Sequence, residues 1–198
     1  MKIQKNNLSS IFLVSSLFVL ILPFNSLGAE YQKYSNREHG FVISFPKTWF
    51  MEIGDLPDVI VKFYDPAGLV NFSIGINKLD KYPQKEIAET VTAPMILNQY
   101  RSNGIDAKLL TSKNFLFRMH PAIDITIQRE LNDSGVAILR QIITYRELRE
   151  YTITFGAAGK TSDSAMDNFN KNLDVLNRML DSFHFTGLRK YDDGHSDK

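Results

Sequence analysis

The chain of 198 residues contains no cysteine. This absence excludes disulfide bonds, thiolate zinc sites, iron–sulfur clusters, a cysteine nucleophile and a lipid anchor attached through an N-terminal cysteine. A chain without disulfides must be held together by packing. The single apolar run at the amino terminus, residues 11–24, is also shorter than the roughly 20 residues that a membrane-spanning helix needs.

The amino terminus has the pattern of a secretory signal peptide. Lys2 and Lys5 precede the apolar run, and small residues occupy the first and third places of the Ser26–Gly28 triplet. A basic head, a short apolar core and an exit of small residues are typical of a signal peptide. We predict that residues 1–28 are removed by cleavage before Ala29, and that the protein is periplasmic or secreted. An uncleaved N-terminal anchor is the alternative, which the short run disfavours.

The charge of the chain is nearly balanced. Its formal net charge is +1, and removal of residues 1–28 leaves 21 basic and 22 acidic residues. This balance argues against a general affinity for nucleic acid or anionic lipid. The length suits one domain, which we place at 34–186. The polar residues 187–198 are expected to form a disordered tail.

Alternation of apolar and polar residues predicts an antiparallel sheet with one apolar face. The clearest alternation spans 70–77, and the Asn132–Gly135 segment has the composition of a hairpin turn. A polar turn is expected between 111 and 115. The predicted strands are 41–45, 49–53, 59–64, 70–77, 108–111, 115–117, 123–128, 136–145 and 151–155.

Two segments have helical periodicity. Pro94 interrupts the segment 83–102, which predicts two short helices or one kinked helix. The closing segment is predicted to be one helix, capped by Thr161 or Ser162. Its apolar stripe consists of Met166, Phe169, Leu173, Leu176, Leu180 and Phe183. These elements predict an α+β fold in which helices cover the apolar face of the sheet.

The opening segment EHGFVISFPKTW resembles the start of the PsbP-like domain of the Mog1/PsbP superfamily, in which a Gly-Phe strand runs into a Pro-x-x-Trp corner. The corresponding residues are Gly40, Phe41, Pro46 and Trp49. The resemblance continues through VIVKFYDP, VNFSIGINKL and REYTITFGA to a helix that ends in Ser-Phe, and covers nearly the whole mature chain.

This resemblance implies an α/β/α sandwich with a central antiparallel β-sheet flanked by helices. It implies an accessory, assembly or binding role in place of catalysis. Some members of the family serve photosystem II, and the cyanobacterial members of that branch are typically lipoproteins. The absence of cysteine in this chain therefore argues against a photosynthetic role.

No residue pattern in the chain predicts catalysis or a cofactor. The chain has no Gly-x-Ser-x-Gly elbow and no glycine-rich phosphate loop. Asp124 and Glu130 are expected to be solvated on the polar face of a strand. We expect an ordinary charged surface around Arg129, Arg140, Arg146 and Arg149. Glutamates between these arginines should neutralise their positive charge.

The histidines also give no strong metal pattern. His39 and His120 are weak candidates for metal ligands, with Glu38 or Asp124 as a possible carboxylate neighbour, but no pair has the His-x-x-x-His spacing. We therefore predict no metal site, and expect His39 in a solvated loop and His120 in a turn before Pro121. His184 is expected at the edge of the core. For Trp49, a structural role is favoured over one in ligand binding.

The sequence thus predicts an exported, non-catalytic PsbP-like protein of the bacterial envelope that binds an unknown envelope protein or a small molecule. A pocket between sheet and helices would favour the small molecule, and an exposed apolar patch would favour the protein. The alternatives are an unrecognised periplasmic hydrolase, which a buried acid or histidine with a strongly perturbed pKa in a cleft would favour, and a photosystem II-associated PsbP homologue.

Overall fold

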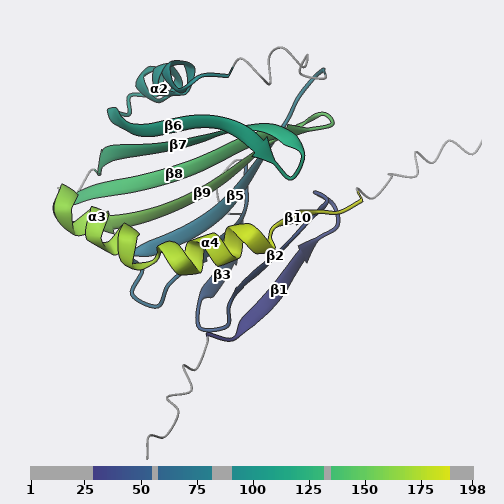
Figure 1. The fold of residues 1–198 in the computed structure, drawn as a ribbon, viewed down its shortest axis with the longest axis horizontal. Helices are drawn as coiled ribbons and strands as arrows, with labels where there is room; N and C mark the ends of the chain where they lie inside the picture. Colours follow the sequence, from purple (N-terminus) through teal and green to yellow (C-terminus); the bar gives the residue numbers. More distant parts are fainter. Residues whose placement is uncertain (1–28, 55–57, 82–90, 132–134, 188–198) are drawn as a thin grey trace, which may run out of the picture.

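The computed structural model describes residues 29–54, 58–81, 91–131 and 135–187. In these residues, long strands form two sheets, and helices pack against the larger sheet (Figure 1). The elements are β1 (Tyr31–Asn36), β2 (Phe41–Pro46), β3 (Phe50–Ile53), β4 (Val59–Tyr64), β5 (Val70–Lys78), α2 (Ala93–Ser102), β6 (Ala107–Phe117), β7 (His120–Leu131), β8 (Gly135–Arg146), β9 (Arg149–Gly159), α3 (Ser162–Lys171), α4 (Leu173–Ser182) and β10 (His184–Phe185).

The larger sheet has seven strands in the order β3-β4-β5-β9-β8-β7-β6. Each neighbouring pair is antiparallel, which confirms the predicted strand direction. The strand predicted at 70–77 is β5, in which the apolar residues are buried and alternate with half-buried residues, as the sequence indicates. The fold is therefore α+β with a dominant antiparallel sheet.

The strand predicted at 41–45 does not belong to the larger sheet, so the expectation of one sheet is wrong. It is β2, which lies between β1 and β10 in a separate three-stranded sheet. Tyr31 is opposite Pro46 in one pairing, and His184 is opposite Val42 in the other. Alternation indicates which face of a strand is buried, but it does not identify the neighbouring strand.

The predicted polar turn between 111 and 115 is also wrong, because β6 is one continuous strand. Its middle residues, 111–114, are exposed, yet the strand stays paired with β7 along its length. β6 is an edge strand of the larger sheet. Polar side chains suit such an edge, since they are solvated while the backbone completes the ladder on one side.

The predicted closing helix is two helices. α3 ends at Lys171 and α4 begins at Leu173, with Asn172 between them at φ −104° and ψ 2°. The Asn172 side chain donates a hydrogen bond to the carbonyl oxygen of Asn168, one turn earlier. An asparagine that bonds to nearby backbone competes with continuation of a helix, which explains a break that the apolar stripe does not indicate.

Pro94 lies in the first turn of α2, which begins at Ala93 after an extended Thr92, so the alternative of one helix kinked at Pro94 is wrong. A proline is tolerated there because its missing N–H would have no helical partner. The earlier part of the predicted helical segment, 82–90, lies outside the described residues, as do positions 132–134 of the predicted hairpin turn. Leu131 and Gly135 face each other on either side of that turn.

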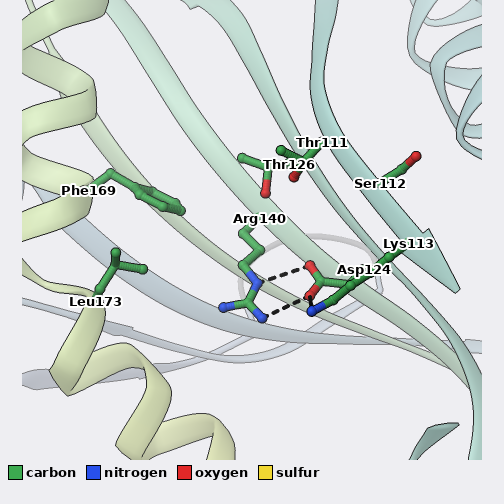
Figure 2. Close-up of a pocket in the computed structure, with 8 residues that line it drawn as sticks. All are labelled: Thr111, Ser112, Lys113, Asp124, Thr126, Arg140, Phe169 and Leu173. Carbon is green, nitrogen blue, oxygen red and sulfur yellow. Dashed lines mark hydrogen bonds and ion pairs between the residues drawn. The ribbon is translucent and has the colours of Figure 1, made fainter. Parts of the chain in front are cut away.

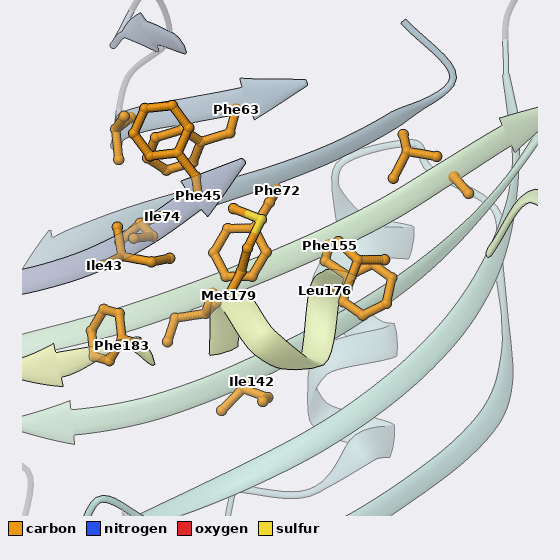
Figure 3. Close-up of a cluster of buried hydrophobic side chains, with 14 of the residues drawn as sticks. Ile43, Phe45, Phe63, Phe72, Ile74, Ile142, Phe155, Leu176, Met179 and Phe183 are labelled. Atoms are coloured by element: carbon orange, nitrogen blue, oxygen red, sulfur yellow. The ribbon is translucent and has the colours of Figure 1, made fainter. Parts of the chain in front are cut away.

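Two apolar clusters lie on opposite faces of the larger sheet. The main core fills the space between this sheet and a layer made of β2, α3 and α4 (Figure 3). Phe45 of β2 meets Phe63 of β4 there, with ring centroids 4.4 Å apart. The second cluster packs α2 against the other face. Ile142 belongs to the first cluster and its neighbour Ile143 to the second, as strand alternation requires.

The predicted signal peptide, residues 1–28, lies outside the described residues, and so do residues 188–198 of the predicted tail. Within the described ranges, none of the helices combines the length and apolar character required for a membrane span.

Candidate functional site

A pocket of about 390 Å³ lies between the larger sheet and the helices α3 and α4 (Figure 2). This volume falls within the roughly 300–1,000 Å³ range of small-molecule sites. We call it the Asp124 pocket, and its lining residues are Thr111, Ser112, Lys113, Asp124, Thr126, Arg140, Phe169 and Leu173.

The polar centre of the pocket is an ion pair between β7 and β8. Arg140 donates from Nε to Oδ1 of Asp124 at 3.0 Å and from Nη2 to Oδ2 at 2.8 Å. Lys113 Nζ on β6 lies 3.5 Å from the same Oδ2. A guanidinium fork that meets both oxygens of a carboxylate is a strong and geometrically specific arrangement. It holds the three charged side chains of the pocket together (Figure 2).

The register of the sheet produces this pair. Thr126 is directly opposite Arg140 and Asp124 is opposite Ile142, so Asp124 and Arg140 are diagonal neighbours on one face. Lys113 is directly opposite Asp124 on the other flanking strand. Three adjacent strands thus bring their charged side chains to one point on the sheet.

The expectation that Asp124 is solvated is wrong. This residue is only 5 % exposed, although Glu130 farther along the same strand is exposed as predicted. The strand pattern correctly separates Asp124 from the apolar face that carries Ile123 and Ile125. It does not indicate that α3 and α4 approach that second face. Burial of a carboxylate then requires a cation, which Arg140 supplies.

Helix residues form the apolar wall of the Asp124 pocket. Phe169 of α3 is 6 % exposed, and its ring stacks on Phe155 of β9 at a centroid distance of 4.7 Å. Leu173, the first residue of α4, continues this wall. Asn177 of α4 accepts a hydrogen bond from Arg140 Nη1 at 3.2 Å, which ties the helix to the charged centre. The pocket therefore has a charged floor and an apolar side.

Sequence reasoning did not find this site. It placed Arg140 in a surface patch and did not propose Lys113, Thr111 or Thr126 as site residues. The signal available was a charged residue between isoleucines, Asp124, followed by an opposite charge on the next strand. The predicted arginine patch is not a single surface either. Burial raises the pKa of Tyr100, which belongs to α2, and the charge of Arg129 opposes this rise, so Arg129 lies on the face of the sheet opposite to Arg140.

A smaller pocket of about 180 Å³ lies on the α2 side of the sheet. Tyr100 donates to Gln141 Oε1 at 2.8 Å, and Gln141 Nε2 donates to Thr154 Oγ1 at 3.0 Å. Burial raises the pKa of Tyr100, while the Arg129 charge and the Gln141 hydrogen bond oppose the increase. The hydroxyl therefore stays protonated at neutral pH, and this chain of hydrogen bonds is neutral.

The histidines lie apart from the Asp124 pocket. Burial lowers the pKa of His39 below 6.5, Glu38 opposes this effect, and the charges of Arg149 and Lys78 reinforce it. The His39 side chain is 14 % exposed, so the expected solvated position is wrong. Its own backbone carbonyl accepts a hydrogen bond from Tyr151 at 2.8 Å.

His120 packs edge-on against Phe185, with ring centroids 5.1 Å apart. Burial lowers its pKa first, Arg146 adds to the lowering and Glu147 opposes it. His120 is half-buried and begins β7 directly after the turn at 118–119, whereas His184 is exposed and not at the edge of the core. Among the described residues, no three His, Asp or Glu side chains gather as a metal site would require.

The residues of the opening motif occupy structural positions. Gly40 adopts a positive φ of 66°, at the end of the turn between β1 and β2. Phe41 is fully buried and stacks on Phe183 at 5.7 Å. Pro46 ends β2, and Trp49 is 8 % exposed within the main core. None of the four lines the Asp124 pocket.

Comparison with known proteins identifies the fold. No family model matches the chain, and no curated protein matches it by sequence. The solution structure of cyanobacterial PsbP (CyanoP) from Synechocystis sp. PCC 6803 matches with a TM-score of 0.58 and 17 % identity, over 83 % of this chain and 98 % of that one. The described residues have the PsbP fold.

Two further solved structures are similar to a lesser degree. One is a protein from Bacteroides thetaiotaomicron, with 13 % identity and a TM-score of 0.48 over 79 % of this chain and 48 % of that one. The other is a protein of unknown function from Pseudomonas aeruginosa, with 14 % identity and a TM-score of 0.40 over 75 % and 94 % of the two chains. The match to cyanobacterial PsbP, and not these two, confirms the PsbP fold predicted from the opening motif.

Proposed function

We propose that this protein is an exported, non-catalytic PsbP-like binding protein of the bacterial envelope, and that it holds a small molecule in the Asp124 pocket. The observation that carries this proposal is the pocket itself, which lies between sheet and helices and combines a charged floor with an apolar wall. Ligand sites commonly have this composition, in which a few polar groups orient the ligand and an apolar surface supplies contact area.

The state of Asp124 favours binding over catalysis. Both of its oxygens accept hydrogen bonds from Arg140, so part of the acceptor capacity of the carboxylate already holds the guanidinium in place. A general base must lie within hydrogen-bond reach of the proton that it removes. The hydroxyl groups of the pocket have no histidine beside them in its lining. Asp124 is a buried acid in a cleft, but its ion pair with Arg140 and the lack of a histidine in the lining favour binding over hydrolysis.

The export of the protein is inferred from the amino-terminal pattern. The basic head, short apolar core and small-residue exit of residues 1–28 support secretion, and residues 29–198 carry a nearly neutral charge. The helices on both faces of the larger sheet support the α/β/α sandwich that the PsbP resemblance implies. A photosystem II role would rest on likeness of fold alone, at 17 % identity.

One observation favours a second candidate function, in which the protein docks on an envelope protein. The edge strand β3 exposes Phe50 by 53 %, Met51 by 43 % and Ile53 by 61 %. An edge strand offers unpaired backbone groups, and exposed apolar side chains beside them are a common feature of protein contacts. This surface lies on the opposite edge of the larger sheet from β6.

Native mass spectrometry of the protein purified from the envelope fraction of its own producer tests the proposal. We expect a species cleaved before Ala29 that carries a fixed additional mass of a small molecule. A co-purifying protein in place of that mass would favour docking. Recovery of the uncleaved chain in the cytoplasm would contradict export, and turnover of a small ester or amide by the purified protein would contradict a non-catalytic role.

A further inference from the structure

The Asp124 pocket has an excess of hydrogen-bond donors and of positive charge. Lys113, Arg140 and Asp124 are the charged residues of its lining, so their net charge is +1. Within the described residues, Arg140 uses three N–H groups, two on Asp124 and one on Asn177. A guanidinium carries five N–H groups, so two remain for a ligand.

Lys113 supplies further donors at the open side of the pocket. Its ammonium group has three N–H donors, while its distance to Asp124 Oδ2 is 3.5 Å and its side chain is 66 % exposed. The hydroxyl groups of Thr111 and Thr126 line the same region (Figure 2). The only carboxylate in the lining already accepts two bonds from Arg140. A ligand that complements these groups must therefore bring acceptors and a negative charge.

We propose that the Asp124 pocket binds an organic monocarboxylate, meaning a small acid with one carboxylate group and an apolar body. This assignment rests on the proposed binding function and specifies its ligand class. One surplus positive charge matches one negative charge. A cationic ligand is disfavoured, because Lys113 and Arg140 would repel it and Asp124 is already paired with these two residues. A bare inorganic anion would leave the wall of Phe169 and Leu173 without contact.

The volume supports an organic body on the acid. A pocket of about 390 Å³ is far larger than the share of about 30 Å³ that one water occupies in the liquid. A carboxylate at the Arg140–Lys113 floor would leave the remaining space beside Phe169. That residue's ring is fixed by stacking on Phe155, so it presents a rigid apolar surface to the ligand.

Three probes of one shape and different charge test the assignment. We would titrate the isotopically labelled full chain, expressed with its own amino terminus, with benzoate, benzamide and benzylammonium, and follow amide chemical shifts. Benzoate is expected to shift the amides of Thr111, Lys113 and Arg140 and to bind at least about tenfold more tightly than either other probe. Lys113→Met is expected to weaken benzoate binding by about tenfold.

Lys108→Met is the matched control, because Lys108 is exposed on the same strand, β6, and does not line the pocket. Its benzoate affinity should equal that of the unmodified chain. Equal affinity for benzamide and benzoate would overturn the assignment. So would benzoate binding that Lys113→Met leaves unchanged, or no binding up to about 10 mM, which is roughly tenfold above a Kd of 1 mM.

The failure of this assignment and the failure of the proposed function give different results. A neutral or cationic small molecule in the native mass spectrum would overturn the carboxylate and leave the binding function intact. Selective benzoate binding, lost in Lys113→Met, by a protein that is recovered uncleaved in the cytoplasm would support the pocket assignment and overturn the envelope function.

Discussion

Replacing Asp124 with leucine is expected to destabilise the fold by about 2–3 kcal/mol. The residue is 5 % exposed, and its loss would leave the Arg140 guanidinium without the carboxylate that now accepts two of its hydrogen bonds. Removing one partner of a fully buried pair costs about 3–5 kcal/mol. The lower figure follows because the Arg140 side chain is 21 % exposed and keeps its bond to Asn177.

The double variant distinguishes the cost of leaving one charge of the pair without a partner from the effect of placing an apolar side chain at these positions. In Asp124→Leu/Arg140→Met no charge of the pair is left alone, so we expect an unfolding free energy within about 1 kcal/mol of the unmodified protein. Urea unfolding followed by the fluorescence of Trp49, the single tryptophan, measures each variant. The double variant should therefore be more stable than Asp124→Leu alone.

An exposed ion pair provides the control. Lys47 and Glu30 are only 2.7 Å apart, but their side chains are 55 % and 76 % exposed. Lys47→Met should therefore cost less than about 1 kcal/mol, despite the shorter distance. The reasoning would be refuted if the losses of the two single variants, Asp124→Leu and Arg140→Met, simply added in the double variant, because additive losses mean that the two residues are not coupled.

Three other substitutions have defined outcomes. Thr161→Ala removes the hydroxyl that caps α3 and should cost about 1 kcal/mol, or roughly 2–4 °C in Tm, whereas Thr92→Ala should cost little because that N-cap makes no side-chain bond. Gly159→Ala should cost about 1–3 kcal/mol by urea unfolding, since the added Cβ would overlap the backbone nitrogen of Ala165, and an unchanged midpoint would contradict that contact. The fold lowers the pKa of His120, so the unfolded chain binds a proton first and the unfolding free energy falls as pH drops below 6.5. His120→Gln should reduce this fall, measured between neutral pH and about one unit below 6.5. An identical pH profile of the variant would argue against this effect.

The local sequence pattern predicted where strands and helices occur better than it predicted which strands pair with each other. The alternation at 70–77 identified β5 because a strand with one face on the core must alternate, and Pro94 marked the start of α2 for an equally local reason. The strand at 41–45 was found as well, but its sheet was not. β10 has only two residues, and no periodicity can be read from so short a strand.

The candidate site was beyond sequence reasoning because its parts come from separate elements. Asp124, Arg140 and Lys113 lie on three strands, and Phe169 belongs to a helix. Each residue has an ordinary local context. Only the sheet register and the position of α3 and α4 over the sheet make Asp124 buried. The sequence shows which residues are charged, but it does not show that α3 and α4 lie over them.

The small sheet is completed only when β10 pairs with β2, which affects folding during synthesis on the ribosome. The backbone N–H of Ser44, in β2, donates to the hydroxyl of Ser182, 138 residues later, just before β10 begins. At about 5–20 residues per second, translation takes roughly 7–28 s to cover that distance. Phe41 and Ile43 have no finished core to enter during this interval. The small sheet of such a nascent chain therefore stays incomplete until almost all of the chain has been made.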